Sequence, residues 1–169
     1  MKLHEEGSLK LEWCWKRYDE LSRAQIHDIF KIRQEVFVIE QNCLYQDLDG
    51  LDIEARHLFV YMQDKSKKTQ IAAYLRVLPP HKMGESKASN DVHIGRVLVG
   101  QDFRGLGMAK LLMMKGMEQA NSTFAGRGIR ISAQLYLQKF YQGLGFELVG
   151  EPYDEDGIEH IEMFNKANP

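Results

Sequence analysis

The chain has few of the features that would place it in a specialised class. Among its 169 residues are two cysteines, Cys14 and Cys43, which form neither a disulfide framework nor a metal-ligand spacing. It has no signal peptide at its start and no apolar run long enough to cross a membrane. We find no internal repeat and no low-complexity tract. These absences favour a cytoplasmic location, and we expect no metal centre and no membrane partner.

Charge of one sign is also scarce, since the formal net charge is −2. Domains that bind nucleic acid usually present a basic face, so this balance argues against a nucleic-acid partner. An apolar content of 44% and a charged content of 27% are ordinary for a soluble globular protein. A chain of this length buries a core without disulfides. We therefore predict a single domain over residues 1–169, with residues 1–8 loosely ordered.

One stretch near the middle of the chain carries the main functional signal. Branched residues predict a strand over 92–99, and apolar residues at three- and four-residue spacing predict a helix from Ala109. Between them, Gly105 and Gly107 leave the backbone accessible. The amides from Arg104 to Ala109 lack helical partners and lie at the positive end of the helix dipole. Such a loop suits a phosphate or pyrophosphate, although a tight turn without a ligand is the alternative reading.

Two common nucleotide-binding motifs do not fit this loop. A P-loop needs a lysine and then a serine or threonine after its glycines, and Met108-Ala109 occupies that place. A dinucleotide-binding fold has Gly-x-Gly-x-x-Gly early in the chain, with an acidic residue about 20 residues on. Here the glycine spacing differs and the loop lies past mid-chain. Neither nucleotide-binding motif therefore explains this loop.

Two motifs together resemble the GNAT superfamily of N-acetyltransferases. Arg104-x-x-Gly107-x-Ala109 is similar to its coenzyme A pyrophosphate loop, and Tyr141-x-x-x-Gly145-Phe146 is similar to its Tyr-x-x-x-Gly-Phe motif. The order and separation of the two match. Further stretches resemble the ElaA-like branch, so that the resemblance covers nearly the whole chain; they are Arg-x-x-Val-Phe-Val-x-Glu-Gln at 33–41, Tyr-Gln-Asp-x-Asp-Gly-x-Asp at 45–52, His57, Gly95-Arg96-Val97 and Ala133-Gln134.

Hydrophobic periodicity predicts an α/β chain with a mixed sheet. The order of strands and helices along the chain is the one that the GNAT acyl-CoA N-acyltransferase fold implies. We expect a twisted sheet of about six to seven strands with flanking helices. A capping box at Ser22 and Gln25 opens the first helix, which breaks near Arg33. Asp156-Gly157 predicts a hairpin turn. The predicted strands lie at 9–16, 57–63, 70–78, 92–99, 129–134, 146–149 and 158–164, and the helices at 23–37, 109–120 and 137–144.

The resemblance implies transfer of an acetyl group from acetyl-CoA to a primary amine of a small molecule or peptide, by direct attack. Tyr141 is then the general acid that protonates the leaving thiolate. Gln134 stands where many relatives have asparagine, which contacts the pantetheine arm. The pyrophosphate would bind Arg104, Gly105, Leu106, Gly107, Met108 and Ala109, and the pantetheine arm would pair with the main chain of Val97, Leu98 and Val99.

The general base is less clear from the sequence, because the central strand offers no carboxylate. Histidine has a suitable reference pKa, so His57 and His160 are the leading candidates, with Glu40, Asp49 and Asp52 as further ones. A structural histidine is the alternative for each. Four residues are assigned to the acceptor side. Arg33, Glu40 and Arg96 would form a buried ion-pair network that shapes the pocket or would hold a substrate carboxylate, and Asp52 belongs to an acidic stretch beside the acceptor cleft.

The acidic stretch at 47–54 has two readings, a subsite that attracts a cationic amine or simply a solvated loop. Rival functions also stay open. An acyl-homoserine-lactone synthase-like acyltransferase would share the arginine-bearing first helix and this acidic loop. A non-catalytic coenzyme A sensor or a nucleotide-binding module would use the same glycine loop. The chain is expected to be a monomer or a homodimer.

Overall fold

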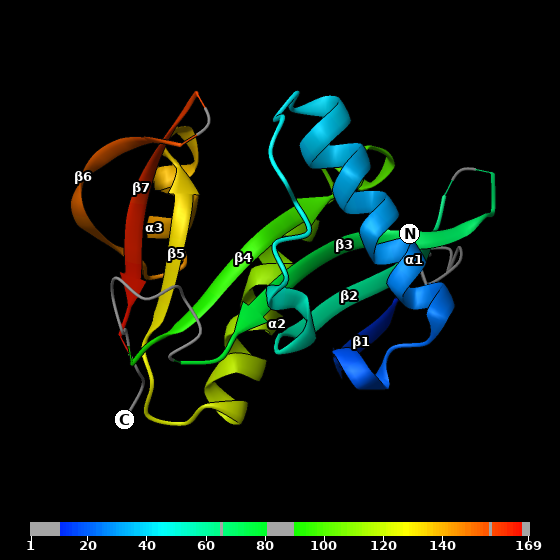
Figure 1. Ribbon diagram of the computed structural model, residues 1–169, viewed down its shortest axis with the longest axis horizontal. Helices are drawn as coiled ribbons and strands as arrows, with labels where there is room; N and C mark the ends of the chain where they lie inside the picture. The colour runs from blue at the N-terminus through cyan, green and yellow to red at the C-terminus, as the bar shows by residue number, and fades with distance from the viewer. Residues whose placement is uncertain (1–10, 65, 81–89, 156, 167–169) are drawn as a thin grey trace, which may run out of the picture.

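A computed structural model describes residues 11–64, 66–80, 90–155 and 157–166. The prediction for residues 1–8 lies outside this range, as do most of the loop predicted at 81–91 and the Asp156 half of the hairpin turn. The described chain forms one seven-stranded sheet in the order β1-β2-β3-β4-β5-β7-β6 (Figure 1). Only β4 and β5 pair in parallel. The predicted mixed sheet is therefore confirmed.

The strands lie close to their predicted positions. β1 is Glu12–Arg17, β2 Arg56–Gln63, β3 Thr69–Leu78, β4 Val92–Val99, β5 Ile129–Gln134, β6 Glu147–Glu155 and β7 Ile158–Asn165. β6 runs well past the predicted end at Val149. Gly150 takes a positive φ of 77°, and the β6–β7 register shifts between Val149 and Tyr153, so a bulge accommodates Pro152 and the strand continues.

The helices follow the predicted pattern, except that the first one changes its geometry after Arg33 instead of breaking there. α1 is Arg23–Arg33 and continues as the π-helical segment η2, Gln34–Glu40. Ser22 and Gln25 form the predicted capping box. α2 is Met108–Thr123 and α3 is Gln138–Gln142. Short 3-10 turns are η1 Tyr18–Glu20, η3 Leu51–Ile53, η4 Gln101–Phe103 and η5 Leu135–Leu137.

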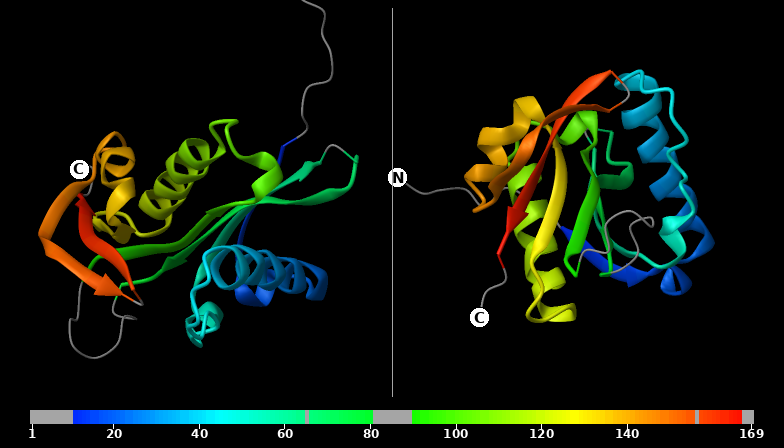
Figure 2. Two further views of the ribbon diagram at one scale, coloured as in Figure 1. Left: turned by 90° about the horizontal axis from the view of Figure 1, so that it is seen from above. Right: turned by 60° about the vertical axis from the view of Figure 1, so that its left-hand side comes forward.

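The two long helices cover opposite faces of the sheet (Figure 2). α1 and η2 pack on one face through Ile29, Ile32 and Val36, whereas α2 packs on the other through Leu112 and Met113. β3 lies between these layers and is buried from Ile71 to Leu78. Gly116 of α2 is required for the close approach, because a Cβ there would lie 2.6 Å from Leu75 Cδ2.

β1 departs from the half-buried strand that its alternation predicts. Trp13 and Trp15 pack against the core on the α2 side, as expected, but Cys14 packs against the core on the α1 side. Both faces of this edge strand are therefore covered, because α1 extends over it.

A bulge in β4 opens the sheet. The β3–β4 register shifts between Tyr74 and Arg76, and Arg96 takes a φ of 53°, which is unusual for a residue with a side chain. β4 and β5 pair only at Val92–Ile129 and His93–Arg130 and then diverge (Figure 1). The wedge between the two strands is the position of the site described next.

Candidate active site

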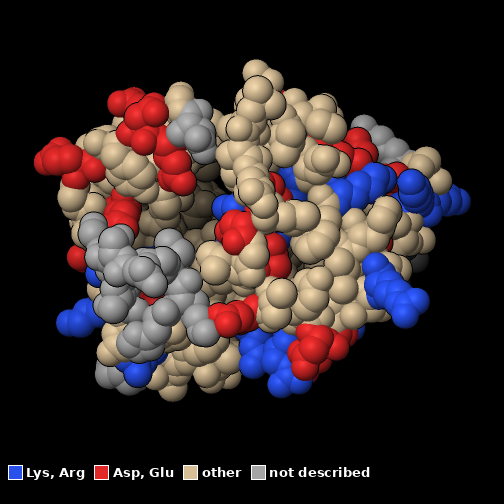
Figure 3. Space-filling model, in the orientation of Figure 1, with Lys and Arg blue, Asp and Glu red and all other residues tan. Residues whose placement is uncertain are grey.

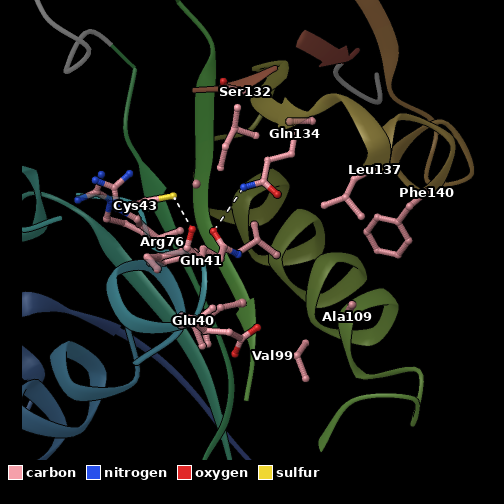
Figure 4. Close-up of a pocket in the computed structure, with 18 of the residues that line it drawn as sticks. Glu40, Gln41, Cys43, Arg76, Val99, Ala109, Ser132, Gln134, Leu137 and Phe140 are labelled. Carbon is pink, nitrogen blue, oxygen red and sulfur yellow. Dashed lines mark hydrogen bonds between the residues drawn. The ribbon is translucent and has the colours of Figure 1, made fainter. Parts of the chain in front are cut away.

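A cavity of about 1070 Å³ follows the wedge between β4 and β5. Figure 3 shows the surface hollowed between the β6–β7 hairpin and the end of η2. Its walls come from η2, the 41–51 loop, β4, the loop before α2, β5, α3 and the β6–β7 hairpin, and Figure 4 shows several of these side chains. Segments far apart in the sequence therefore face one space.

The glycine loop forms one end of this cavity, which we call the donor end. Gly105 and Gly107 have φ values of 76° and 73°, and no atom lies within 4 Å of where their Cβ would be. Gly107 caps α2 without a side-chain hydrogen bond. The first-turn amides of α2 have no helical partner, and Met108 and Ala109 line the cavity. Leu106 lies outside the lining and is 61% exposed.

Arg104 is held by an acidic residue from η2. Its Nη1 and Nη2 donate to the two carboxylate oxygens of Glu40 at 2.7 and 2.9 Å, and its Nε donates to the carbonyl of Val99 at 3.1 Å. Both side chains line the cavity. Glu40, which the sequence places on the acceptor side, thus lies at the donor end.

A second contact crosses the wedge beside this pair. Gln134 Nε2 of β5 donates to Gln41 Oε1 at 3.4 Å (Figure 4). Val97, Leu98 and Val99 line the cavity on the β4 side, at the level where β5 no longer pairs with that strand. The predicted pantetheine contacts therefore lie together along the two walls.

Tyr141 of α3 lines the cavity and is only 5% exposed. Burial raises the pKa of its hydroxyl to about 12, so this group stays protonated at neutral pH. Its ring packs edge-on against Phe140 and Phe146. No residue in the described part of the chain accepts a hydrogen bond from the hydroxyl. The phenol is therefore a protonated group on the cavity wall whose hydroxyl has no protein acceptor among the described residues.

At the opposite, acceptor end, three arginines and three aspartates form a closed ring of ion pairs, which we call the ion-pair ring. It joins α1, the 41–51 loop, η3, β3 and the β4 bulge. Its contacts are Arg33–Asp47 (2.9 Å), Asp47–Arg96 (2.7 Å), Arg96–Asp49 (3.3 Å), Asp49–Arg76 (2.7 Å), Arg76–Asp52 (3.2 Å) and Asp52–Arg33 (2.6 Å).

Three aspartates of the acidic stretch are therefore ion-paired, whereas Glu54 is exposed, as the solvated-loop reading predicts. Asp47 and Asp52 are buried and ion-paired, and the side chain of Asp49 is 27% exposed. Burial acts to raise the pKa of Asp49, but hydrogen bonds from Arg76 and from the Leu51 amide outweigh it and lower this pKa to about 2. The ring is electrically neutral. Asp49, Arg76 and Arg96 reach the cavity, whereas Arg33, Asp47 and Asp52 lie behind them.

Arg76 is the ring member that the sequence reading missed. It lies in the apolar run of β3 and is buried, so a charged partner was to be expected from burial alone. The sequence signal that could have identified it is a single arginine within the apolar run from Ile71 to Leu78. Which aspartates it pairs with depends on the loop geometry and not on spacing.

His57 lies behind the ring and does not line the cavity. Its Nε2 donates to the carbonyl of Asp52 at 2.9 Å, and its Nδ1 accepts from the hydroxyl of Tyr74 at 2.8 Å. Burial lowers the pKa of this imidazole, so it is neutral. Both ring nitrogens are occupied, which leaves none for an acceptor amine.

His160 of β7, by contrast, lines the cavity. Its Nδ1 donates to the carbonyl of Ile158 at 2.8 Å, so in the neutral ring Nε2 carries the lone pair. The imidazole stacks on Tyr153. Ser132 Oγ of β5 hydrogen-bonds the Tyr153 hydroxyl and Glu155 Oε2. Ser132 and Glu155 also line the cavity and were not identified from the sequence, because neither belongs to a motif.

Two searches for other types of site found nothing in the described residues. Within them, no group of three or more histidine, cysteine, aspartate or glutamate side chains is placed to hold a metal ion. Among the helices that the structure describes, none is long and apolar enough to span a membrane.

Comparisons with known proteins agree with this geometry. The family model described as "Acetyltransferase (GNAT) domain" matches residues 20–166. Protein ElaA of Escherichia coli is 37% identical over 158 residues, covering 90% of this chain and 95% of ElaA. The crystal structure of that ElaA superposes with a TM-score of 0.80, covering 93% of this chain and 100% of the other.

Two further solved structures are similar in fold but differ in how much sequence they share with this chain. An acyl-CoA N-acyltransferase from Pseudomonas aeruginosa has a TM-score of 0.82 at 35% identity, covering 92% of this chain and 99% of that one. The acyl-homoserine lactone synthase MesI has a TM-score of 0.71 at 16% identity, covering 94% of this chain and 90% of that one, and so shares the fold alone. The chain therefore belongs to the GNAT acetyltransferase family, in its ElaA-like branch.

Proposed function

We propose that this acyltransferase moves an acetyl group from acetyl-CoA to a primary amine of a small molecule or peptide. The observation that supports this most directly is the wedge between β4 and β5. At one end of the wedge lies the glycine loop, whose backbone amides have no helical partner. On its wall lies the protonated phenol of Tyr141. A thioester lying along the wedge would have its diphosphate on the amides from Arg104 to Ala109. Its pantetheine arm would pair with the main chain of Val97–Val99, as an added strand would.

The reaction requires the amine nitrogen to attack the thioester carbonyl carbon. A β4 amide beside the bulge would stabilise the tetrahedral oxyanion. The carbon–sulfur bond then breaks, and the Tyr141 hydroxyl gives its proton to the departing thiolate. The attacking amine loses a proton to Nε2 of His160, directly or through water. The products are the amide and free coenzyme A, and the enzyme is restored when His160 releases its proton to solvent and Tyr141 regains one.

His160 is preferred as the base because the other candidates are engaged. Glu40 is paired with Arg104, Asp49 and Asp52 belong to the ion-pair ring, and both nitrogens of His57 are hydrogen-bonded. His160→Gln should lower kcat/KM at neutral pH by about 100-fold. This loss should shrink as pH rises, because more of the amine is then unprotonated. A loss that is the same at every pH would contradict the assignment.

The proposed function is tested by thiol release from acetyl-CoA with a broad panel of primary amines. We expect amine-dependent release and an acetylated product by mass spectrometry. Tight acetyl-CoA binding without release from any amine would replace the proposal with a coenzyme A sensor. Lactone formation from S-adenosylmethionine and a long-chain acyl-CoA would favour the synthase-like alternative. Stabilisation by ATP or NAD but not by coenzyme A would indicate a nucleotide-binding module.

Two further expectations from the sequence accompany this proposal and stay predictions. One is a cytoplasmic location. The other is a monomeric or homodimeric state, which size-exclusion chromatography with light scattering would decide.

A further inference from the structure

The charge balance of the acceptor end points to a class of acceptor. The arginines that reach this end, Arg76 and Arg96, belong to the ion-pair ring, where three aspartates offset the three guanidinium charges. An incoming carboxylate on Arg96 would lie beside the carboxylate of Asp49, which is already 3.3 Å from Arg96 Nη2. Recognition of an acidic acceptor is thus opposed by a charge already in place.

The remaining charge at this end is negative. Glu155 lines the cavity, and no described arginine or lysine lies within ion-pair distance of it. Its Oε2 accepts from Ser132 Oγ at 3.3 Å and lies 4.0 Å from Nδ1 of His160. The two other carboxylates that line the cavity differ, because Glu40 is paired with Arg104 and Asp49 with Arg76.

Part of the cavity wall is apolar, although Gln41 and Gln46 of the 41–51 loop also line the cavity. Cys43 and Leu51 line it on the loop side, and Ile158 lines it next to His160. Tyr45 also lines it, with its ring facing the Arg96 guanidinium. This apolar part suits methylene groups and not a chain of hydroxyls or amides. Acidic side chains also gather on the neighbouring β6–β7 hairpin (Figure 3), which favours the approach of cations.

From these observations we propose that the acceptor is an amine with a second positive charge across a short aliphatic chain, such as an alkyl diamine. This inference rests on the proposed function. One amine reacts beside Nε2 of His160 as the free base, while the other, protonated, pairs with the carboxylate of Glu155. Ser132 holds that carboxylate toward the cavity. Glu155 is thus a specificity residue that selects among amines and takes no part in the bond changes.

The test compares amines that share a carbon chain. Thiol release is measured with putrescine against butylamine and with cadaverine against pentylamine, and the readout is the ratio of kcat/KM between diamine and monoamine. We expect the unmodified enzyme to favour the diamine by about fivefold, the size of effect that one partly exposed ion pair provides. Glu155→Gln should bring the ratio close to one, and Glu155→Lys should invert it.

Glu159→Gln is the matched control, because it removes the same charge from an exposed neighbour in β7 that does not line the cavity. It should keep the diamine preference. A ratio near one in the unmodified enzyme, the same ratio in Glu155→Gln, or a preference for γ-aminobutyrate over butylamine would overturn the inference.

The inference can fail separately from the proposed function. If no amine yields thiol, calorimetry of putrescine with the coenzyme A-loaded protein still decides it. Binding that weakens about fivefold in Glu155→Gln and not in Glu159→Gln supports the inference, and binding that is equal or absent overturns it.

Discussion

The two ends of the cavity are built in different ways. The donor end comes mainly from one continuous stretch, Val97 to Ala109, with Glu40 of η2 beside it, and offers mainly main-chain groups of β4 and α2. The acceptor end comes from side chains of η2, the 41–51 loop, β3, β4, β5 and the β6–β7 hairpin, with a ring of buried charge behind it. Main-chain recognition tolerates side-chain change, whereas side-chain recognition is altered by single substitutions. One fold can therefore keep its donor while its acceptor varies.

The largest expected effect concerns stability at the acceptor end. Arg33→Met removes one cation of the ion-pair ring and leaves Asp47 and Asp52 buried beside it without that partner. We expect the free energy of unfolding to fall by about 3–5 kcal/mol, measured by urea denaturation. Arg104→Met at the donor end is the comparison, and it should cost less than about 1 kcal/mol because Arg104 and Glu40 are each about 40% exposed. Equal losses would remove the distinction between the two ends.

The next effect concerns Tyr141, on the cavity wall. Tyr141→Phe removes the proposed proton donor and should lower kcat by about 100-fold. The dissociation constant for coenzyme A should change by less than about twofold, since main-chain groups hold the donor. Both are measured directly, the first by thiol release and the second by calorimetry.

Tyr61→Phe is the matched control for that substitution. Burial raises the pKa of Tyr61 to about 12 as well, but Tyr61 lies outside the cavity, on β2. A raised pKa without access to the thioester should leave kcat unchanged. A loss of kcat as small in Tyr141→Phe as in Tyr61→Phe would exclude Tyr141 as the acid.

A smaller effect is expected from pH, through Asp49 of the ion-pair ring. Its pKa is about 2 in the folded chain and 3.8 in the reference state. Because folding lowers this pKa, the stabilisation is fully present above the reference value and is lost as pH falls through the folded one. The stability difference between the unmodified chain and Asp49→Asn should shrink by about 1 kcal/mol from about pH 5 to about pH 2, allowing for solvent screening. A constant difference would show that the pairs with Arg76 and Arg96 do not hold this pKa low.

The sequence predicted the donor end better than the acceptor end, because the donor end is built from local structure and the acceptor end is not. The strand, the glycine turn and the helix of the donor end are local structures, so their residues could be identified from spacing. The ion-pair ring joins Arg33 to Arg76 and Arg96 through aspartates in one loop, and nothing in the sequence states which charge meets which. His57 and His160 were likewise both candidates for the base, with His57 placed slightly ahead. Only tertiary packing placed one behind the ring and the other on the cavity wall.

The smallest expected effect concerns the pair of Glu40 and Arg104 at the donor end. A diphosphate on the glycine loop would compete with the Glu40 carboxylate for the Arg104 guanidinium. Glu40→Gln should therefore tighten coenzyme A binding by about twofold to threefold at low salt, measured by calorimetry. Glu35→Gln is the control, since Glu35 lies on the same η2 segment but pairs with Lys31 and does not line the cavity. If coenzyme A binds Glu40→Gln more weakly, then Glu40 positions Arg104 for the diphosphate and does not compete with it. The side chains of Glu40 and Arg104 would then help to hold the donor, and the separation between main-chain and side-chain recognition would no longer hold.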